Sequence, residues 1–252
     1  NSTLGWRMTN PNMPSEWTVA LGEGAEILAD KYSISRQEQD EFAAHSHAKA
    51  AAAWAAGHFV GEVAQYPGAT LEQDECIRAD STVEKLATLK PVFRKEGSVT
   101  AGNSSPMNDG SAAMLLMSGD GVERHSVKAR ARIVARATSG VEPQLYGIGP
   151  VQAAQKALTN AGLTWSDIDV VELNEAFAAQ SLACLREWPE LDTQKVNPLG
   201  GAIAIGHPLG CSGVRLLTTL TNQLERTGGR YGLAAMCIGV GQGIALIIEN
   251  NL

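Results

Sequence analysis

The sequence predicts an α/β layered fold with a covered sheet, and three observations support this class. From residue 97 onward, short apolar stretches alternate with helix-forming stretches, as in layered α/β domains. Glycine-rich turns separate several of these stretches. Hydrophobic residues make up 44% of the 252 residues, which is enough to bury a substantial core.

The N-terminal part, residues 1–97, is expected to form a largely helical cap. Ser35 and Glu38 have the spacing of a capping box, and the alanine-rich stretch that follows should remain helical until Gly57 ends it in a left-handed conformation. Residues 60–97 mix Pro, Gly and charged residues, so we expect an irregular excursion with one short helix in the stretch STVEKLATL.

The remaining elements follow in order along the chain. A loop rich in Gly, Asn and Ser leads into the apolar run AMLLMS at 113–118, which predicts a buried strand. Pro150 and Gly162 mark the start and the end of a helix. The other expected elements are strands at 129–139 and 167–174, helices at 176–188 and 211–228, and two strands within 231–249 joined by a glycine-rich turn.

The composition argues against several classes of partner. Lys and Arg number 20 against 27 Asp and Glu, and the resulting net charge of −7 predicts no binding to nucleic acid. No apolar run approaches the roughly 20 residues needed to span a membrane, and no secretory signal is recognised, so we expect no membrane contact. The four cysteines form no CxxC pair, which predicts reduced thiols and a cytoplasmic protein.

His207 is the first candidate catalytic residue. It lies between two glycine-rich turns, and Pro208 fixes the backbone after it, so the imidazole should stand at a loop tip ahead of a helix. A helix start lowers the pKa of a histidine and keeps the ring neutral, able to accept a proton. The alternative is a structural turn that happens to contain a histidine.

Cys237 is the second candidate, at the end of an apolar strand and just before Gly239. A strand that opens into a glycine-rich turn exposes backbone N–H groups, and such groups stabilise oxyanions in acyl-transfer sites. The alternative is a buried thiol that acts as a small hydrophobic side chain.

Three polar residues lie after a predicted strand or within a predicted loop. Asn174 follows a strand, where it could cap the next helix or serve at the edge of the sheet where open α/β folds place their sites. Asn103 and Ser105 lie in a polar loop that could bind an extended ligand or simply form a turn.

Metal binding is not expected. His45 and His47 are two residues apart on a helix and point to different faces. His207 and Cys211 offer two ligands where zinc takes at least three protein groups.

Four stretches in this order resemble the thiolase family, specifically the degradative 3-oxoacyl-CoA thiolases. They are AGNSSPMNDGSAA, ELNEAFAAQ, NPLGGAIAIGHPLGCSG and MCIGVGQG. The stretches GWRMTNPNM and SGVEPQLYGIGP look most like the β-ketoadipyl-CoA type. The resemblance implies a layered αβαβα fold with a helical loop domain at 1–97, the last segment of the N-terminal half at 98–126 and the complete C-terminal half at 127–252. The first half would then be largely missing.

The resemblance also implies a role for each matching position. His207 would activate the nucleophilic thiol and, with a water held by Asn174, bind the thioester oxygen. Cys237 would act as acid and base toward the substrate α-carbon and the sulfur of the leaving or entering thiol. The backbone N–H of Gly239 would supply half of a second oxyanion hole, and Ser105 would contact the pantetheine arm of coenzyme A.

The implied reaction is a ping-pong acyl transfer in fatty acid or aromatic compound degradation. A 3-oxoacyl-CoA is cleaved by free CoA into acetyl-CoA and a shortened acyl-CoA through an acyl-cysteine. Acyl-CoA and coenzyme A are the implied partners, and coenzyme A is a substrate rather than a cofactor. No metal or other cofactor is implied. The intact protein is expected to be a homodimer or homotetramer, as thiolases usually are.

Two departures from the family pattern affect these expectations. The family's nucleophilic cysteine has no match among Cys76, Cys184, Cys211 and Cys237, so this chain alone is expected to be inactive and to expose apolar surface. Leu21 replaces the usual methionine near the acyl tunnel, which leaves the chain-length preference open.

Three rival functions stay open from the sequence. The first is a condensing enzyme or a lipid-transfer type of thiolase, against which Asn174, His207 and Cys237 argue together. The second is a hydrolase in which Cys237 attacks with His207 as its base, and a requirement for free CoA would separate it from a thiolase. The third is a non-catalytic fragment that binds CoA without turnover.

Overall fold

A four-stranded mixed sheet forms the centre of the computed structural model, which describes residues 8–68 and 70–250. The strands are β1 (Ala131–Gly140), β2 (Val170–Leu173), β3 (Tyr231–Ile238) and β4 (Gln242–Asn250), in the order β1-β4-β3-β2. β4 pairs antiparallel with both β1 and β3, whereas β2 and β3 are parallel. Because β2 and β3 are parallel, their carboxyl ends lie at the same end of the sheet.

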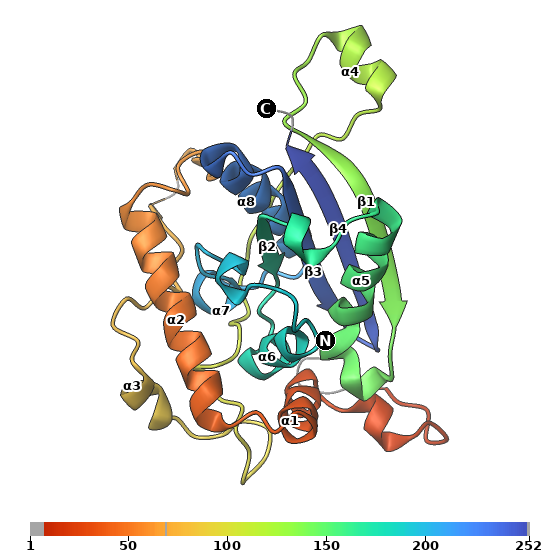
Figure 1. Ribbon diagram of the computed structural model, residues 1–252. Helices are drawn as coiled ribbons and strands as arrows, with labels where there is room; N and C mark the ends of the chain where they lie inside the picture. Colours follow the sequence, from red (N-terminus) through yellow and green to blue (C-terminus); the bar gives the residue numbers. More distant parts are fainter. Residues whose placement is uncertain (1–7, 69, 251–252) are drawn as a thin grey trace.

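Helices cover both faces of this sheet (Figure 1). α5 (Gly149–Ala161) packs on one face and α8 (Ser212–Thr227) on the other. Because side chains alternate along a strand, Leu233 of β3 packs on the α5 side and Ala234 packs on the α8 side. The predicted α/β class with a covered sheet is therefore confirmed.

Local end signals explain where the main helices begin and end. Pro150 lies in the first turn of α5, and Gly162 follows its last residue with φ +68°. The capping box predicted for α2 (Arg36–Ala55) is present: the Ser35 hydroxyl accepts from the Glu38 N–H at 3.2 Å, and the Ser35 N–H donates to the Glu38 carboxylate at 2.7 Å.

The N-terminal helices pack on α6 (Ala178–Arg186), beyond the end of the sheet, rather than on the strands. Leu28 of α1 (Leu21–Lys31) shares an apolar cluster with Phe177, and Ala43 of α2 shares another with Ala178. The shorter elements are η1 (Ser15–Thr18), α3 (Val83–Ala87), η2 (Pro143–Ile148), η3 (Trp165–Asp167), η4 (Thr193–Lys195) and α7 (Ala202–Ile205). The cap thus faces the segment that follows β2.

The prediction of a buried strand at 113–118 is wrong. These residues form no strand and lead to α4 (Gly119–His125), which projects from the body of the molecule at the top of Figure 1. Leu115 and Leu116 are 80% and 68% exposed. A strand needs a neighbour to satisfy its backbone groups, and no strand of the described chain lies beside this run.

The three-part division at 97/98 and 126/127 stays a prediction. Part of the stretch GWRMTNPNM, together with the outer ends of the first and last predicted domains, lies outside the described residues. None of the helices described is long and apolar enough to cross a membrane.

Candidate active site

Asn174 and Cys237 both lie at the carboxyl ends of two adjacent parallel strands, β2 and β3. Leu173 of β2 pairs with Ala235 of β3, and the Asn174 N–H donates to the Ala235 carbonyl at 3.0 Å. Cys237 lies two residues further along β3. The carboxyl ends of parallel strands are where α/β folds place their sites.

Asn174 does not cap a helix, contrary to one of the two sequence interpretations. α6 begins only at Ala178, after the extended N-cap residue Phe177. Phe177 is held in that conformation by a β-bridge to Ser104. The Asn174 side chain is buried and free to face the loop that carries His207.

His207 is held at both ring nitrogens. Its Nε2 lies 3.2 Å from Asn174 Nδ2, and its Nδ1 lies 2.6 Å from the Ser212 hydroxyl. That hydroxyl donates its single proton to the Pro208 carbonyl at 2.9 Å, so it can only accept from His207. Nδ1 therefore carries the imidazole proton, and the unprotonated Nε2 faces Asn174.

Burial lowers the pKa of His207 to about 4, with a smaller contribution from the positive charge of Arg215. The sequence interpretation of a neutral histidine agrees with this direction, but the cause is burial rather than the start of α8. At neutral pH the ring is a free base with its lone pair directed into the site.

A buried carboxylate shapes the loop ahead of His207. Glu175 is 2% exposed and accepts from the Ser46 hydroxyl at 2.7 Å, the Asn197 amide at 2.9 Å and the Ile203 N–H at 3.2 Å. A Cβ on Gly201 would lie 2.3 Å from the Glu175 carboxyl carbon, so only glycine fits there. Sequence reasoning assigned Glu175 no role, and its only local signal was the position beside Asn174.

Asn108 supports the turn that presents His207. Its side-chain oxygen accepts from the His207 N–H at 3.3 Å, and its amide lies 2.9 Å from the Cys76 sulfur. Gly206 has φ +99°, and a Cβ there would lie 2.5 Å from the Asn108 oxygen. The turn therefore needs both the positive φ and the missing side chain. Sequence reasoning did not single out Asn108.

Cys237 is half-buried, and burial raises the pKa of its thiol to about 12. The thiol is therefore neutral at physiological pH and able to donate a proton. It packs against the apolar cluster that includes Phe177, and Leu21 packs against the same cluster. Gly239 lies in the turn after β3, and its N–H donates to no other described residue.

Ser105 is tied to the chain segment after β2. Both its N–H and its hydroxyl donate to the Ala176 carbonyl, each at 3.0 Å. Since the hydroxyl proton is used, the Ser105 oxygen can only accept from a ligand. The structure thus brings Ser105, Asn174 and His207 into one hydrogen-bonded region.

The other cysteines are placed differently. All four are free thiols, as predicted. Cys184 and Cys211 are buried, and burial raises the pKa of both. Within 8–68 and 70–250, no group of three or more His, Cys, Asp or Glu side chains is arranged to hold a metal ion.

Two family models match this chain. The model described as "Thiolase, N-terminal domain" matches residues 12–120, and the model described as "Thiolase, C-terminal domain" matches residues 127–250. Because part of the chain matches the N-terminal model, the expectation that the first half is largely missing stays a prediction.

Several proteins that are similar to this chain in sequence or structure are thiolases or acetyl-CoA acetyltransferases. A β-ketoadipyl-CoA thiolase of Pseudomonas putida is 51% identical over 257 residues, which cover 99% of this chain and 64% of that protein. The structure of a Bacillus anthracis acetyl-CoA acetyltransferase matches with a TM-score of 0.88 and 41% identity, over 97% of this chain and 66% of that one. Human mitochondrial 3-ketoacyl-CoA thiolase in complex with CoA matches with a TM-score of 0.86 and 40% identity, over 98% of this chain and 66% of that one.

Proposed function

The chain belongs to the thiolase family, and from that premise we propose that it carries the acid–base residues of an acetyl-CoA C-acyltransferase. The reaction would cleave a 3-oxoacyl-CoA with free CoA into acetyl-CoA and a shortened acyl-CoA. The observation that carries the proposal is the position of His207, whose basic Nε2 lies 3.2 Å from Asn174 beside the strand end that holds Cys237.

His207 would act first as a base. Its Nε2 is unprotonated and would take the proton of a nucleophilic cysteine thiol, which then attacks the 3-oxo carbon. Once protonated, Nε2 can donate to the thioester oxygen of the departing enolate. The amide of Asn174 points to the same nitrogen and would hold a water that donates to the same oxygen.

Cys237 would carry one proton between the two half-reactions. When the bond between C2 and C3 breaks, C2 takes the bonding electrons and then the proton of the Cys237 thiol, which gives acetyl-CoA. The Cys237 thiolate next takes the proton of the incoming CoA thiol, whose sulfur attacks the acyl thioester and releases the nucleophilic cysteine. The N–H of Gly239 would donate to the oxyanion formed at C3.

Ser105 would bind the pantetheine arm of coenzyme A. Its oxygen can only accept a hydrogen bond, which suits the amide N–H groups of that arm. The similar human thiolase binds CoA in the structure with which this chain aligns. Leu21 would contribute to the acyl side of the site, since it packs against the same cluster as Cys237.

The substrate and assembly of the whole protein are part of the proposal. Similarity to β-ketoadipyl-CoA thiolases favours a role in aromatic compound degradation, and a role in fatty acid degradation is the alternative. The chain spans 64% of the length of that relative. We propose that the nucleophilic cysteine is supplied from outside this sequence, that this chain alone is inactive and that the intact protein is a homo-oligomer.

The raised pKa of Cys237 argues against a cysteine hydrolase. A thiol with a pKa of about 12 is almost entirely protonated at neutral pH, whereas a nucleophilic cysteine reacts as its thiolate. The same property suits a proton donor.

Acetyl-CoA release from a 3-oxoacyl-CoA, with and without free CoA, tests the proposal. We expect no turnover by this chain and CoA-dependent turnover by the protein extended to the length of its relatives. In the extended protein, His207→Asn and Cys237→Ser should each lower the rate about 10²- to 10⁴-fold, whereas the exposed control His45→Asn should not. Release of free acid without CoA would instead indicate a hydrolase.

A further inference from the structure

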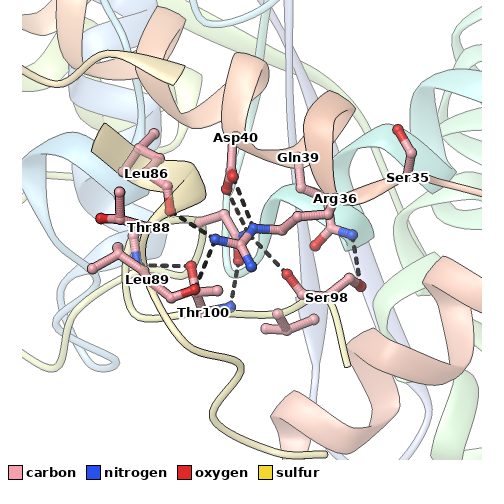
Figure 2. A network of polar contacts seen from close by, with 12 residues as sticks. Ser35, Arg36, Gln39, Asp40, Leu86, Thr88, Leu89, Ser98 and Thr100 are labelled. Carbon is pink, nitrogen blue, oxygen red and sulfur yellow. Dashed lines mark hydrogen bonds and ion pairs between the residues drawn. The ribbon is translucent and has the colours of Figure 1, made fainter. Parts of the chain in front are cut away.

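A buried carboxylate in the helical cap lies at one end of a hydrogen-bonded path to the candidate site. Asp40 of α2 is 1% exposed and accepts from Arg36 Nε at 2.8 Å and from Asn103 Nδ2 at 3.0 Å. Arg36 also donates to the carbonyls of Leu86 and Leu89, which fixes its guanidinium against the short helix α3 (Figure 2). Arg36, which is fixed by two backbone carbonyls, therefore holds the Asp40 carboxylate in place.

Asn103 connects Asp40 of α2 to the start of α6. It is fully buried, and its side-chain oxygen accepts from the Thr100 N–H at 2.8 Å while its amide also donates to the Ser98 carbonyl at 3.1 Å. Its backbone carbonyl accepts from the Ala178 N–H at 2.9 Å. The position of Asn103 is thus determined jointly by α2 and by the start of α6.

The residues after Asn103 lie directly against the site. Ser105 donates twice to the Ala176 carbonyl, and the Ala176 N–H donates to the Asn174 carbonyl at 3.1 Å. Asn174 in turn faces the Nε2 of His207. The loop at 103–105 therefore links the cap to the residues proposed to bind coenzyme A and to move protons.

A second buried carboxylate fixes the start of the same loop. Glu26 of α1 is 2% exposed and accepts from the N–H groups of Ser98 and Val99 at distances of 2.9 to 3.0 Å. The Ser98 hydroxyl donates to Glu26 and accepts from the amide of Gln39; Gln39, Asp40 and Ser98 lie together in Figure 2. Glu26 therefore holds the loop at Ser98 and Val99, and the contact between Asn103 and Asp40 holds it again five residues after Ser98.

We propose that Asp40 is a positioning residue for the coenzyme A contact of Ser105. This inference rests on the proposed function. Without the Asp40 carboxylate, the Asn103 amide loses one of its two acceptors and the buried part of Arg36 loses its counter-ion. The loop at 103–105 would then sample positions in which Ser105 no longer faces the ligand.

Amide hydrogen exchange in this chain tests the positioning role without using activity. In Asp40→Ala, the N–H groups of Ser105 and Ala178 should exchange at least about tenfold faster, because they join the loop to the segment after β2. The Asn174 N–H, which is bonded within the sheet, should keep its protection and show that the variant is folded. Unchanged exchange at both Ser105 and Ala178 would overturn the inference.

Coenzyme A binding, measured by titration calorimetry, tests the functional consequence. We expect Asp40→Ala to weaken the affinity about tenfold, the effect of one hydrogen bond to a charged group. The effect should largely vanish when Asn103 is already alanine, because the path is then interrupted. Asp40→Asn, which keeps the side-chain size, should act in the same direction if the alanine variant folds poorly.

The control is Asp80→Asn, which removes a carboxylate paired with Lys85 on the exposed surface of the same cap. It should leave both exchange and affinity unchanged, and an equal loss of affinity in this control would contradict a specific role for Asp40. If the unaltered protein does not bind coenzyme A, the proposed function fails, while the exchange result still decides whether Asp40 positions the loop.

Discussion

The Ser212 hydroxyl has one proton, and the structure directs it to the Pro208 carbonyl. The lone pair left on the oxygen faces His207 Nδ1 at 2.6 Å, so Ser212 favours the tautomer in which Nε2 is the base, as does the Asn174 amide, which can only donate to Nε2. Residue identity at this position therefore matters for proton transfer although Ser212 itself would touch no substrate.

Replacing Ser212 with alanine should release this selection. In the unaltered protein we expect the ¹⁵N chemical shifts of His207 to show a proton on Nδ1 and none on Nε2 at pH 7. In Ser212→Ala the Nδ1–H loses its acceptor, so the two tautomers should be mixed. Ser212→Thr keeps the hydroxyl and serves as the control. An unmixed spectrum in the alanine variant would show that other contacts set the tautomer.

Val240 has an unusual backbone conformation. It has φ +68°, a conformation that a β-branched residue adopts only with strain, whereas Ser33, Ser126 and Asn197 tolerate positive φ more readily. Val240 lies in the turn between β3 and β4, one residue after Gly239.

Glycine at position 240 should stabilise the fold. The left-handed conformation costs a non-glycine residue about 1–2 kcal/mol, more than the roughly 0.5–1 kcal/mol that glycine loses in conformational entropy. Val240→Gly is therefore expected to raise the free energy of unfolding, measured with denaturant, by up to about 1 kcal/mol. The half-exposed Val127, whose φ is not positive, provides the control. Val127→Gly should lower the free energy of unfolding. A decrease in both variants would show that Val240 is not strained.

An ion pair joins β2 to α8 inside the protein. Glu172 of β2 is fully buried, with its carboxylate 3.0 Å from Arg215 and 2.7 Å from the Gln223 amide, both on α8. Burial raises the pKa of Glu172 from its usual 4.5 to about 7, although Arg215 and Gln223 each act in the opposite direction. A folded-state pKa above the unfolded value means that this group's contribution to stability falls as pH rises between these values.

Arg215→Met should therefore destabilise the protein more at pH 8 than at pH 5. At pH 8 Glu172 is left buried, charged and without its partner, which costs about 3–5 kcal/mol. At pH 5, below its pKa of about 7, Glu172 is already protonated and neutral, so most of this cost should be absent. Denaturant unfolding at the two pH values measures the difference. Arg230→Met, which removes an exposed pair with Glu249, should change little at either pH, and a pH-independent loss for Arg215→Met would contradict the argument.

The helices with local end signals and the strands β1 to β4 were predictable from the sequence, whereas the run at 113–118 was not. The capping box of Ser35 and Glu38 lies within four residues, and α2 begins there as predicted. The run at 113–118 has the composition of a strand but no strand beside it in the described chain. A pairing partner cannot be read from composition alone.

A similar difference separates the candidate site residues that the sequence indicated from those that it did not. His207 and Cys237 stood out because glycines surround them in the sequence. Asp40 and Glu175 were missed because their roles depend on contacts such as that between Ser46 and Glu175, which are 129 residues apart. Buried carboxylates that accept backbone and side-chain donors leave no short motif.

The segment leading to α4 exposes a run of adjacent apolar side chains on the surface of the molecule. Leu115 and Leu116 are adjacent and exposed, and Met114 and Met117 beside them are 39% and 38% exposed. Contiguous apolar surface of this kind binds hydrophobic dyes and promotes association, whereas single exposed apolar residues are ordinary.

We expect this chain to enhance the fluorescence of a hydrophobic dye and the double variant Leu115→Asp/Leu116→Asp to lose most of that enhancement. The variant should fold normally, because neither side chain contributes to an apolar core cluster. Val60→Asp is the matched control: Val60 is 77% exposed but lies elsewhere on the surface, so dye binding should persist. Equal fluorescence in both variants would mean that the dye binds another surface, and the apolar run would then be an extended arm without an exposed patch of functional size.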